Sequence, residues 1–262
     1  MALPTSMSRL SIRDEMQDLA GRNYRHWIDF IEQTDAVLAP PRGLVRPRDK
    51  CAVIVEPRRH RHLSYVIRNV MHFLDPSWGL CIVHGTENRE FVEQIIEGWG
   101  DVLLLNCGSV DLPDYAYADY RCRTAFWEQI PSEIILTFET DSILRRSGID
   151  DFLEYDYVGA PWLSALLDYR NVPGPVGNGG LSLRHKSAML RILREHEHEP
   201  GTSEDQFFSQ WLYRDGYNLP SFETASHFST ETILQPDCLG IHKAWLYHFE
   251  TPFVQLLDGI HY

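Results

Sequence analysis

The sequence predicts an α/β fold, a twisted and mostly parallel β-sheet with helices on both faces. Short runs of apolar, strand-forming residues alternate along the chain with longer segments whose apolar residues recur at helical spacing. The strand runs are apolar at consecutive positions, which is typical of strands covered on both faces. At 262 residues, with 44% hydrophobic and 23% charged residues, the chain can bury a full core as one large domain.

Residues 1–48 are predicted to form a helix and a proline-rich linker outside the main domain. A segment that starts at Ser11 has acids in its first turn and apolar residues at helical spacing as far as Ile31. Between Ala39 and Arg48, prolines and a glycine prevent the helix from continuing. The main domain is therefore placed at residues 49–262, with a first half at about 49–142 and a second at about 143–250.

The first half is predicted to contain four buried strands separated by helices. The expected strands share an apolar run and cover residues 51–58, 80–85, 102–105 and 134–138. Apolar residues at helical spacing occur between them, at residues 63–71, 91–96 and 125–130. A strand followed by a helix is the repeating unit of a parallel sheet.

The strand at residues 134–138 leads into two carboxylates, Glu139 and Asp141, separated by Thr140. If the chain stays extended through Thr140, the alternation of a β-strand points both carboxylates to the same side. Two oxygen ligands that converge suit a divalent cation such as Mg²⁺ or Mn²⁺, which can in turn hold phosphates. An ordinary strand followed by a polar turn explains the same residues equally well.

The second half has a less regular pattern. A short helix and a strand are expected at residues 149–157, and a mobile loop at Leu163–Pro173. Three glycines in Gly177–Gly180 precede a strand at residues 181–183 and let the backbone approach a ligand closely. A tight hairpin turn is the alternative for these glycines.

The last third of the chain offers a second acid pair. Ser203 caps a predicted helix whose first turn holds Glu204 and Asp205, and these acids either compensate the helix dipole or face a site. A strand and a turn are expected from Ala225 to Glu231. The alternating acids and histidines at residues 195–199 are interpreted as a solvated helix end rather than a metal site.

The composition excludes several classes of function. A net charge of −13 argues against nucleic acid and anionic membranes as partners, so any bound phosphate needs a local arginine or a metal. The five cysteines lack paired spacing, which argues against disulfides and a zinc site. We find no secretory signal and no apolar run long enough to span a bilayer, and we expect a soluble protein in the cytoplasm of its cell or host cell.

Six short motifs, taken in their order and spacing, carry a resemblance to a known family: residues 55–58, 126–128, 138–142, 156–162, 177–184 and 204–208. They resemble a family of domains of uncharacterised function that is regarded as glycosyltransferase-like, over roughly residues 51–245. They also resemble the general plan of GT-A glycosyltransferases. The resemblance implies a GT-A-like, Rossmann-type fold with a nucleotide-binding first half and an acceptor-binding second half.

The resemblance also implies roles for individual residues. Glu139, Asp141 and His242 correspond to the ligands of Mn²⁺ or Mg²⁺, with Asp141 as the surest of the three. Asp205 corresponds to the general base, which the helix dipole is expected to keep ionised, and Glu204 corresponds to a residue that holds the acceptor. The remaining candidates are expected to bind the donor, at the nucleotide or where sugar and acceptor meet: Val55, Glu56, Pro57, Arg58, Thr140, Asn178, Gly179 and Gly180. For Glu56 and Arg58, a surface salt bridge is an equally weighted alternative.

The function implied is an inverting, metal-dependent transfer of a sugar from a nucleotide-sugar donor, with UDP-sugars favoured, to a glycan or another hydroxyl acceptor. A nucleotidyltransferase or phosphotransferase would also use paired carboxylates with a metal, although the chain lacks a GxxxxGK[ST] loop. A non-catalytic carbohydrate-binding protein is the third alternative, because 12% of the residues are aromatic and aromatic rings stack on sugars.

Overall fold

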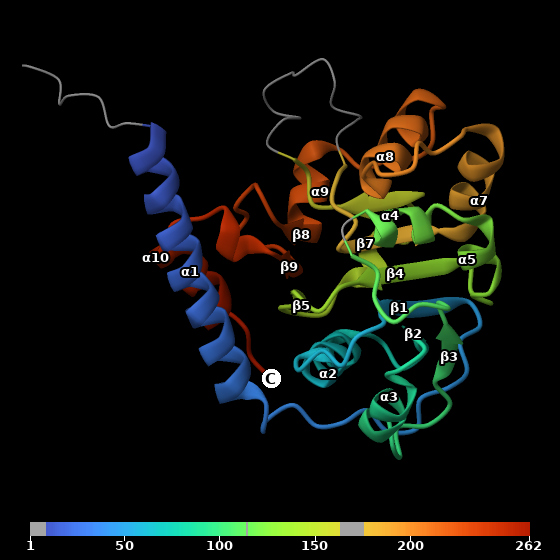
Figure 1. Cartoon of the computed structure of the whole chain (residues 1–262), viewed down its shortest axis with the longest axis horizontal. Helices are drawn as coiled ribbons and strands as arrows, with labels where there is room; N and C mark the ends of the chain where they lie inside the picture. Colours follow the sequence, from blue (N-terminus) through green and yellow to red (C-terminus); the bar gives the residue numbers. More distant parts are fainter. Residues whose placement is uncertain (1–8, 114, 163–175) are drawn as a thin grey trace, which may run out of the picture.

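The computed structural model describes residues 9–113, 115–162 and 176–262, so the loop expected at Leu163–Pro173 lies outside the described residues. Its main sheet has six strands in the order β3-β2-β1-β4-β7-β6 (Figure 1). The strands are β1 (Lys50–Glu56), β2 (Gly79–His84), β3 (Leu103–Asn106), β4 (Ile134–Phe138), β6 (Tyr157–Gly159) and β7 (Leu181–His185).

Strand pairing confirms a mostly parallel sheet. β1 pairs in parallel with β2 and β4, and β2 pairs in parallel with β3. β7 is antiparallel to both β4 and β6, which makes the sheet mixed at this edge. Every residue of β2 is buried, and so are all residues of β1 except Lys50, as expected for strands covered on both faces.

A second, three-stranded sheet brings a late part of the chain to the end of β4. It consists of β5 (Ser142–Leu144), β9 (Gly240–His242) and β8 (Ser229–Thr230), in the order β5-β9-β8. In the antiparallel register of β5 and β9, Ser142 lies opposite His242. The histidine is therefore held one residue away from Asp141, although 100 residues of chain separate them.

Helices surround the two sheets. Those of the first half are α2 (Leu63–Phe73), α3 (Arg89–Ile95), α4 (Ala116–Arg121) and α5 (Thr124–Glu128). Those of the second half are α7 (Lys186–Glu195), α8 (Glu204–Arg214), α9 (Phe222–Phe228) and α10 (Glu250–Asp258), with short 3₁₀ helices η1 (Ile149–Phe152) and η2 (Ala244–Leu246). In Figure 1, α2 and α3 lie next to β1–β3, whereas α7 and α8 lie next to β7.

The N-terminal helix α1 (Arg9–Thr34) packs against the C-terminal part of the chain (Figure 1). The rings of Trp27 and Trp245 lie 4.9 Å apart, and both side chains are buried. The amide nitrogen of Asn23 donates hydrogen bonds to the backbone oxygens of Trp245 at 3.1 Å and His248 at 2.8 Å. Among the described residues, no helix has the length and apolar character needed to cross a membrane.

One predicted element is wrong. The expected strand and turn from Ala225 to Glu231 is mostly helix α9, and only Ser229 and Thr230 form a strand. The helix begins after Ser221, whose hydroxyl oxygen accepts a hydrogen bond from the backbone N–H of Thr224 at 3.1 Å. This capping signal precedes the apolar residues on which the strand prediction was based.

Candidate functional site

Two neighbouring pockets open at the carboxyl end of β1 and β4. The first, here called the β1 pocket, has a volume of about 310 Å³ and is lined by Val55, Glu56, Pro57, Arg58, Asp111, Leu112, Tyr117, Glu139, Thr140, Asp141 and Lys243. The second, here called the glycine-loop pocket, has a volume of about 270 Å³, and its lining includes Arg121, Asn178, Gly179, Gly180, Glu204, Asp205, Glu231, His242 and Tyr247. Tyr117, Glu139 and Lys243 line both pockets.

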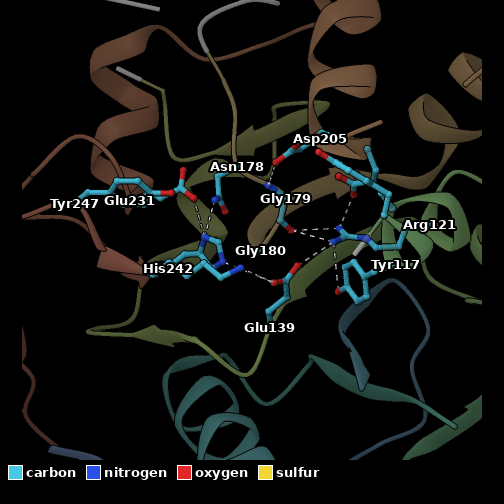
Figure 2. Close-up of a pocket in the computed structure, with 15 residues that line it drawn as sticks. Tyr117, Arg121, Glu139, Asn178, Gly179, Gly180, Asp205, Glu231, His242 and Tyr247 are labelled. Carbon is cyan, nitrogen blue, oxygen red and sulfur yellow. Dashed lines mark hydrogen bonds and ion pairs between the residues drawn. The ribbon is translucent and has the colours of Figure 1, made fainter. Parts of the chain in front are cut away.

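Glu139, Asp141 and His242 come together between these pockets. Figure 2 shows Glu139 and His242 directed toward each other. The Nε2 atom of His242 lies 3.4 Å from Asp141 Oδ1 and 3.7 Å from Glu139 Oε2. One ligand atom from each residue falls within 4.8 Å of the others. The sequence thus identified three residues that the fold brings together.

The predicted reason for this convergence is wrong. The chain does not stay extended through Thr140, because β4 ends at Phe138 and the backbone N–H of Ser142 donates to Glu139 O at 3.0 Å. This hydrogen bond closes a turn around Thr140 and Asp141. Both carboxylates reach His242 because the backbone turns and not because they share the parity of a strand.

Opposite charges dominate the electrostatics of this group. Burial opposes protonation of His242, but Asp141, Glu139 and Glu231 outweigh it and hold the pKa of the imidazole well above its ordinary value. Burial likewise favours neutral acids, yet the positive charges of His242 and Lys243 beside them lower the pKa of Asp141 and that of Glu139. The acids are therefore ionised at neutral pH.

The residues fit a divalent cation. Asp141 Oδ1 and His242 Nε2 are buried, lie 3.4 Å apart and have no hydrogen-bond partner among the described residues. A cation bound between them would take the place of the proton that the surrounding acids favour on His242. Carboxylate oxygens with one imidazole nitrogen form a donor set that Mn²⁺ accepts and Mg²⁺ tolerates. On its other side, His242 Nδ1 lies 3.2 Å from Glu231 Oε1 and 2.6 Å from the amide nitrogen of Asn178.

Lys243 adds a second positive charge at the same place. Its ammonium lies 3.3 Å from Asp141 Oδ2 and 3.8 Å from Glu139 Oε2. Among the described residues other than glycine, Lys243 alone has a positive φ, 48°, a conformation that costs free energy and is often retained at functional sites. The sequence analysis missed this residue, although it directly follows His242.

Asp205 faces the glycine-loop pocket from the first turn of α8 (Figure 2). Its carboxylate accepts hydrogen bonds from the backbone N–H groups of Gly179 at 3.2 Å and Gln206 at 2.8 Å. Burial, followed by the charge of Glu204, raises the pKa of Asp205 to about 6. The carboxylate is therefore mostly ionised at pH 7, as expected from the sequence, although burial raises its pKa.

Glu204 has different surroundings from those expected of an acceptor-binding residue. Its side chain is only 5% exposed, and its Oε1 atom lies 2.9 Å from an Nη atom of Arg121 and 2.7 Å from one of Arg184. The carboxylate thus meets two guanidinium groups, and the residue also lines the glycine-loop pocket.

Glu56 and Arg58 form the salt bridge that the sequence analysis gave as an alternative. Glu56 is buried, with 2% of the residue exposed. Its carboxylate accepts three hydrogen bonds from Arg58: from the backbone N–H at 2.9 Å, from Nε at 2.9 Å and from Nη2 at 3.0 Å. Both residues nevertheless line the β1 pocket together with Thr140. The salt bridge and a role in binding a ligand are therefore compatible.

Several further lining residues were not identified from the sequence, among them Tyr117, Arg121 and Glu231. Tyr117 and Arg121 come from α4, a short helix that the sequence analysis did not predict, and Glu231 directly follows β8. The surface group Glu195, His196 and Asp215 also has metal-like spacing. The ring of His196, however, stacks on Trp211 at 3.7 Å and contacts Asp215 at 2.7 Å, so this helix end is more packed than expected.

A family described as "Protein of unknown function (DUF5672)" matches residues 113–242, just under half of the chain. The matched region contains Glu139, Asp141, Asp205 and His242, and it confirms the resemblance to a family of uncharacterised domains. Among curated proteins, no match was found.

Solved structures of glycosyltransferases show distant similarity. The glycosyltransferase GlyE of Streptococcus pneumoniae TIGR4 matches with a TM-score of 0.48 and 16% identity over 75% of this chain. The alignment covers 54% of that structure, so the chain spans about half the length of GlyE. The galactosyltransferase LgtC, in complex with donor and acceptor sugar analogs, matches with a TM-score of 0.43 and 10% identity over 62% of this chain and 70% of its own.

Proposed function

We propose that this chain is a metal-dependent glycosyltransferase that moves a sugar from a nucleotide-sugar donor to a hydroxyl acceptor. The observation that carries the proposal is the meeting of two pockets at Tyr117, Glu139 and Lys243. The residues that can hold a divalent cation lie between the two pockets, and the glycine-loop pocket also contains a carboxylate that can accept a proton. A transfer between two substrates needs this arrangement.

The donor is assigned to the β1 pocket. A nucleotide there would lie against the end of β1, at Val55–Arg58, with its diphosphate directed toward Asp141 and Lys243. Glu139, Asp141 and His242 would hold the cation, which supplies positive charge to neutralise the diphosphate as it leaves. Arg58 and Lys243 are the cationic side chains of this chain that line the pocket, and both can contact phosphate oxygens. A UDP-sugar is the first donor to test.

The acceptor is assigned to the glycine-loop pocket, where Asp205 takes up the proton of the attacking hydroxyl. A bond forms between the acceptor oxygen and the anomeric carbon of the sugar, while the bond from that carbon to the phosphate oxygen breaks and its electron pair leaves with the diphosphate. A general base works best with a pKa near the working pH, and a pKa of about 6 meets this condition. Attack from the face opposite the leaving group makes the transfer inverting.

The test is incubation of the protein with individual nucleotide sugars, Mn²⁺ and a panel of sugar acceptors. Release of a nucleoside diphosphate together with a glycosylated product supports the proposal. Release of a sugar 1-phosphate would indicate nucleotidyl transfer instead. Sugar binding by calorimetry without any release would indicate a carbohydrate-binding protein.

A further inference from the structure

Glu204 and Asp205 are neighbours in the chain, but their carboxylates have separate surroundings. Successive side chains of an α-helix point about 100° apart, which directs the two carboxylates toward different partners. Asp205 faces the glycine-loop pocket, where the N–H of Gly179 reaches it (Figure 2). Glu204 also borders this pocket, but it is only 5% exposed and its Oε1 atom is directed at the guanidinium groups of Arg121 and Arg184.

Both arginines are buried and fixed by further contacts. The side chain of Arg184 is 0% exposed, and its guanidinium carbon lies 4.6 Å from the ring centre of Tyr157 and 5.5 Å from that of Phe208. Arg121 is 2% exposed and donates hydrogen bonds to Gly179 O at 3.2 Å and Thr137 Oγ1 at 3.1 Å. Two buried positive charges need a buried negative charge, and Glu204 supplies it.

We propose that Glu204, Arg121 and Arg184 form a buried triad that positions Asp205 and the backbone of Gly179, and that Glu204 does not contact the acceptor. These three are positioning residues, since none of them is assigned to the reacting atoms. The catalytic importance of holding Asp205 in place rests on the proposed function, in which Asp205 is the general base.

The contact between the triad and Asp205 passes through Gly179. A Cβ atom at Gly179 would lie 2.7 Å from Glu204 Oε2 and 3.1 Å from an Nη atom of Arg184, so only glycine lets the loop rest directly on the triad. The carbonyl of Gly179 accepts from Arg121, and its N–H donates to Asp205. A change in the triad therefore moves a group that holds the carboxylate of Asp205.

The triad also reaches the cation site. Arg121 Nη1 lies 3.6 Å from Glu139 Oε1. Arg121 therefore contacts both Glu139, an acid of the cation site, and Glu204. Arg184 has no such contact with Glu139 among the described residues. The two arginines therefore share Glu204 but differ in what else they hold.

The charges of the triad also set the protonation of Asp205. Glu204 disfavours the ionised form of Asp205, whereas Arg184 favours it. Tyr157, from β6, also faces Asp205, but burial raises the pKa of its phenol, which stays neutral. Loss of the Glu204 charge should therefore lower the pKa of Asp205, and simultaneous loss of the Arg184 charge should partly reverse the change.

The experiment compares Glu204→Gln, the double variant Glu204→Gln/Arg184→Met and the control Glu199→Gln, which changes an exposed acid just before α8. Melting temperatures are measured, and the pKa of Asp205 is followed by NMR of protein labelled at the aspartate carboxyl carbons. We expect Glu204→Gln to lower the Tm by roughly 10 °C and the control by less than about 2 °C. The double variant should regain part of the loss, and the pKa of Asp205 should fall by roughly one unit in Glu204→Gln.

A Glu204→Gln variant with the Tm and the Asp205 pKa of the unmodified chain would overturn the proposal. If Glu204→Gln does not fold, the double variant provides the test. A buried triad predicts that removing one of the two unpaired arginines restores folding. A double variant that also does not fold would overturn the proposal. Neither measurement needs turnover, so a chain without transferase activity can still contain the triad. In an active enzyme, a tenfold rise in acceptor KM at unchanged kcat in Glu204→Gln would instead show an acceptor contact.

Discussion

The two acid pairs, Glu139/Asp141 and Glu204/Asp205, lie on opposite sides of one site and differ in how their carboxylates are directed. The first pair follows a strand, and a turn brings both side chains to His242. The second pair begins a helix, where successive positions diverge, so Asp205 faces a pocket and Glu204 faces two arginines. The backbone around a pair of acids therefore decides whether they act together.

The two pairs also differ in protonation. His242 and Lys243 lower the pKa of the first pair, whereas burial and the charge of Glu204 raise the pKa of Asp205. Titratable groups whose pKa values are pushed apart in one site are typical of a division into charge-holding and proton-accepting roles. Five measurements test this difference.

The largest effect is expected from Asp141→Asn, which removes a charged ligand from the proposed cation site. We expect turnover to fall by a factor on the order of a thousand, because the cation provides several kcal/mol of charge stabilisation in the transition state. Calorimetric titration with Mn²⁺ should show a matching loss of affinity. Asp258→Asn, at an exposed acid of α10, serves as the control. Full activity of Asp141→Asn in the presence of a chelator would remove the cation from the proposal.

Asp205→Asn is expected to reduce transfer by a factor on the order of a hundred or more, with unchanged affinity for the donor. Its folded pKa is raised, so the ionised carboxylate destabilises the fold at pH 7. The variant should therefore be more stable than the unmodified chain at pH 7, by at most about 3 kcal/mol, and this gain should disappear below about pH 4. Denaturant titrations at the two pH values measure the difference. Normal turnover of Asp205→Asn would show that Asp205 is not the general base and only contributes to the start of α8.

The pH dependence of kcat/KM gives a third, smaller effect. Because only the ionised form of Asp205 accepts a proton, we expect activity to fall below a midpoint of about pH 6. Activity at pH 5 should be roughly a tenth of the plateau value. A midpoint near pH 4 would point to a base with an ordinary pKa and would contradict the assignment of Asp205.

Lys243→Gln tests whether the lysine beside the first acid pair also contacts the donor. Removal of one partly exposed ammonium should weaken nucleoside diphosphate binding about fivefold, which corresponds to about 1 kcal/mol. Lys243→Arg keeps the charge and should restore most of the affinity. The dissociation constants are measured by calorimetry in the presence of Mn²⁺. Equal affinities in all three proteins would confine Lys243 to neutralising Glu139 and Asp141.

Arg58→Gln should have the smallest effect, a two- to threefold rise in donor KM, because the side chain is more than half exposed and already pairs with Glu56. Arg59→Gln, at the next residue of the same loop, is the matched control. A loss of more than about tenfold would show that Arg58 leaves Glu56 to bind phosphate directly.

The sequence by itself determined the local elements of this protein. The apolar run of β4 with the acids after it, the start of α8 and the glycines before β7 could be recognised from local patterns along the chain. Ser203 precedes α8 as predicted, but its side chain makes no capping hydrogen bond. The local signal failed at residues 225–231, where the cap at Ser221 outweighs the residues that favour a strand. The resemblance to a family added His242, for which the local pattern gave no specific role.

The tertiary structure alone decided which of these residues meet. His242 reaches Asp141 because β9 pairs with β5, and Arg121 reaches Glu204 because α4 and α8 pack together. These contacts join residues 83 to 101 positions apart, and no periodic pattern extends over such distances. Burial of Glu204 between two arginines and exposure of Asp205 to a pocket both depend on that packing, which is why the sequence could name the pair of acids but not assign their separate roles.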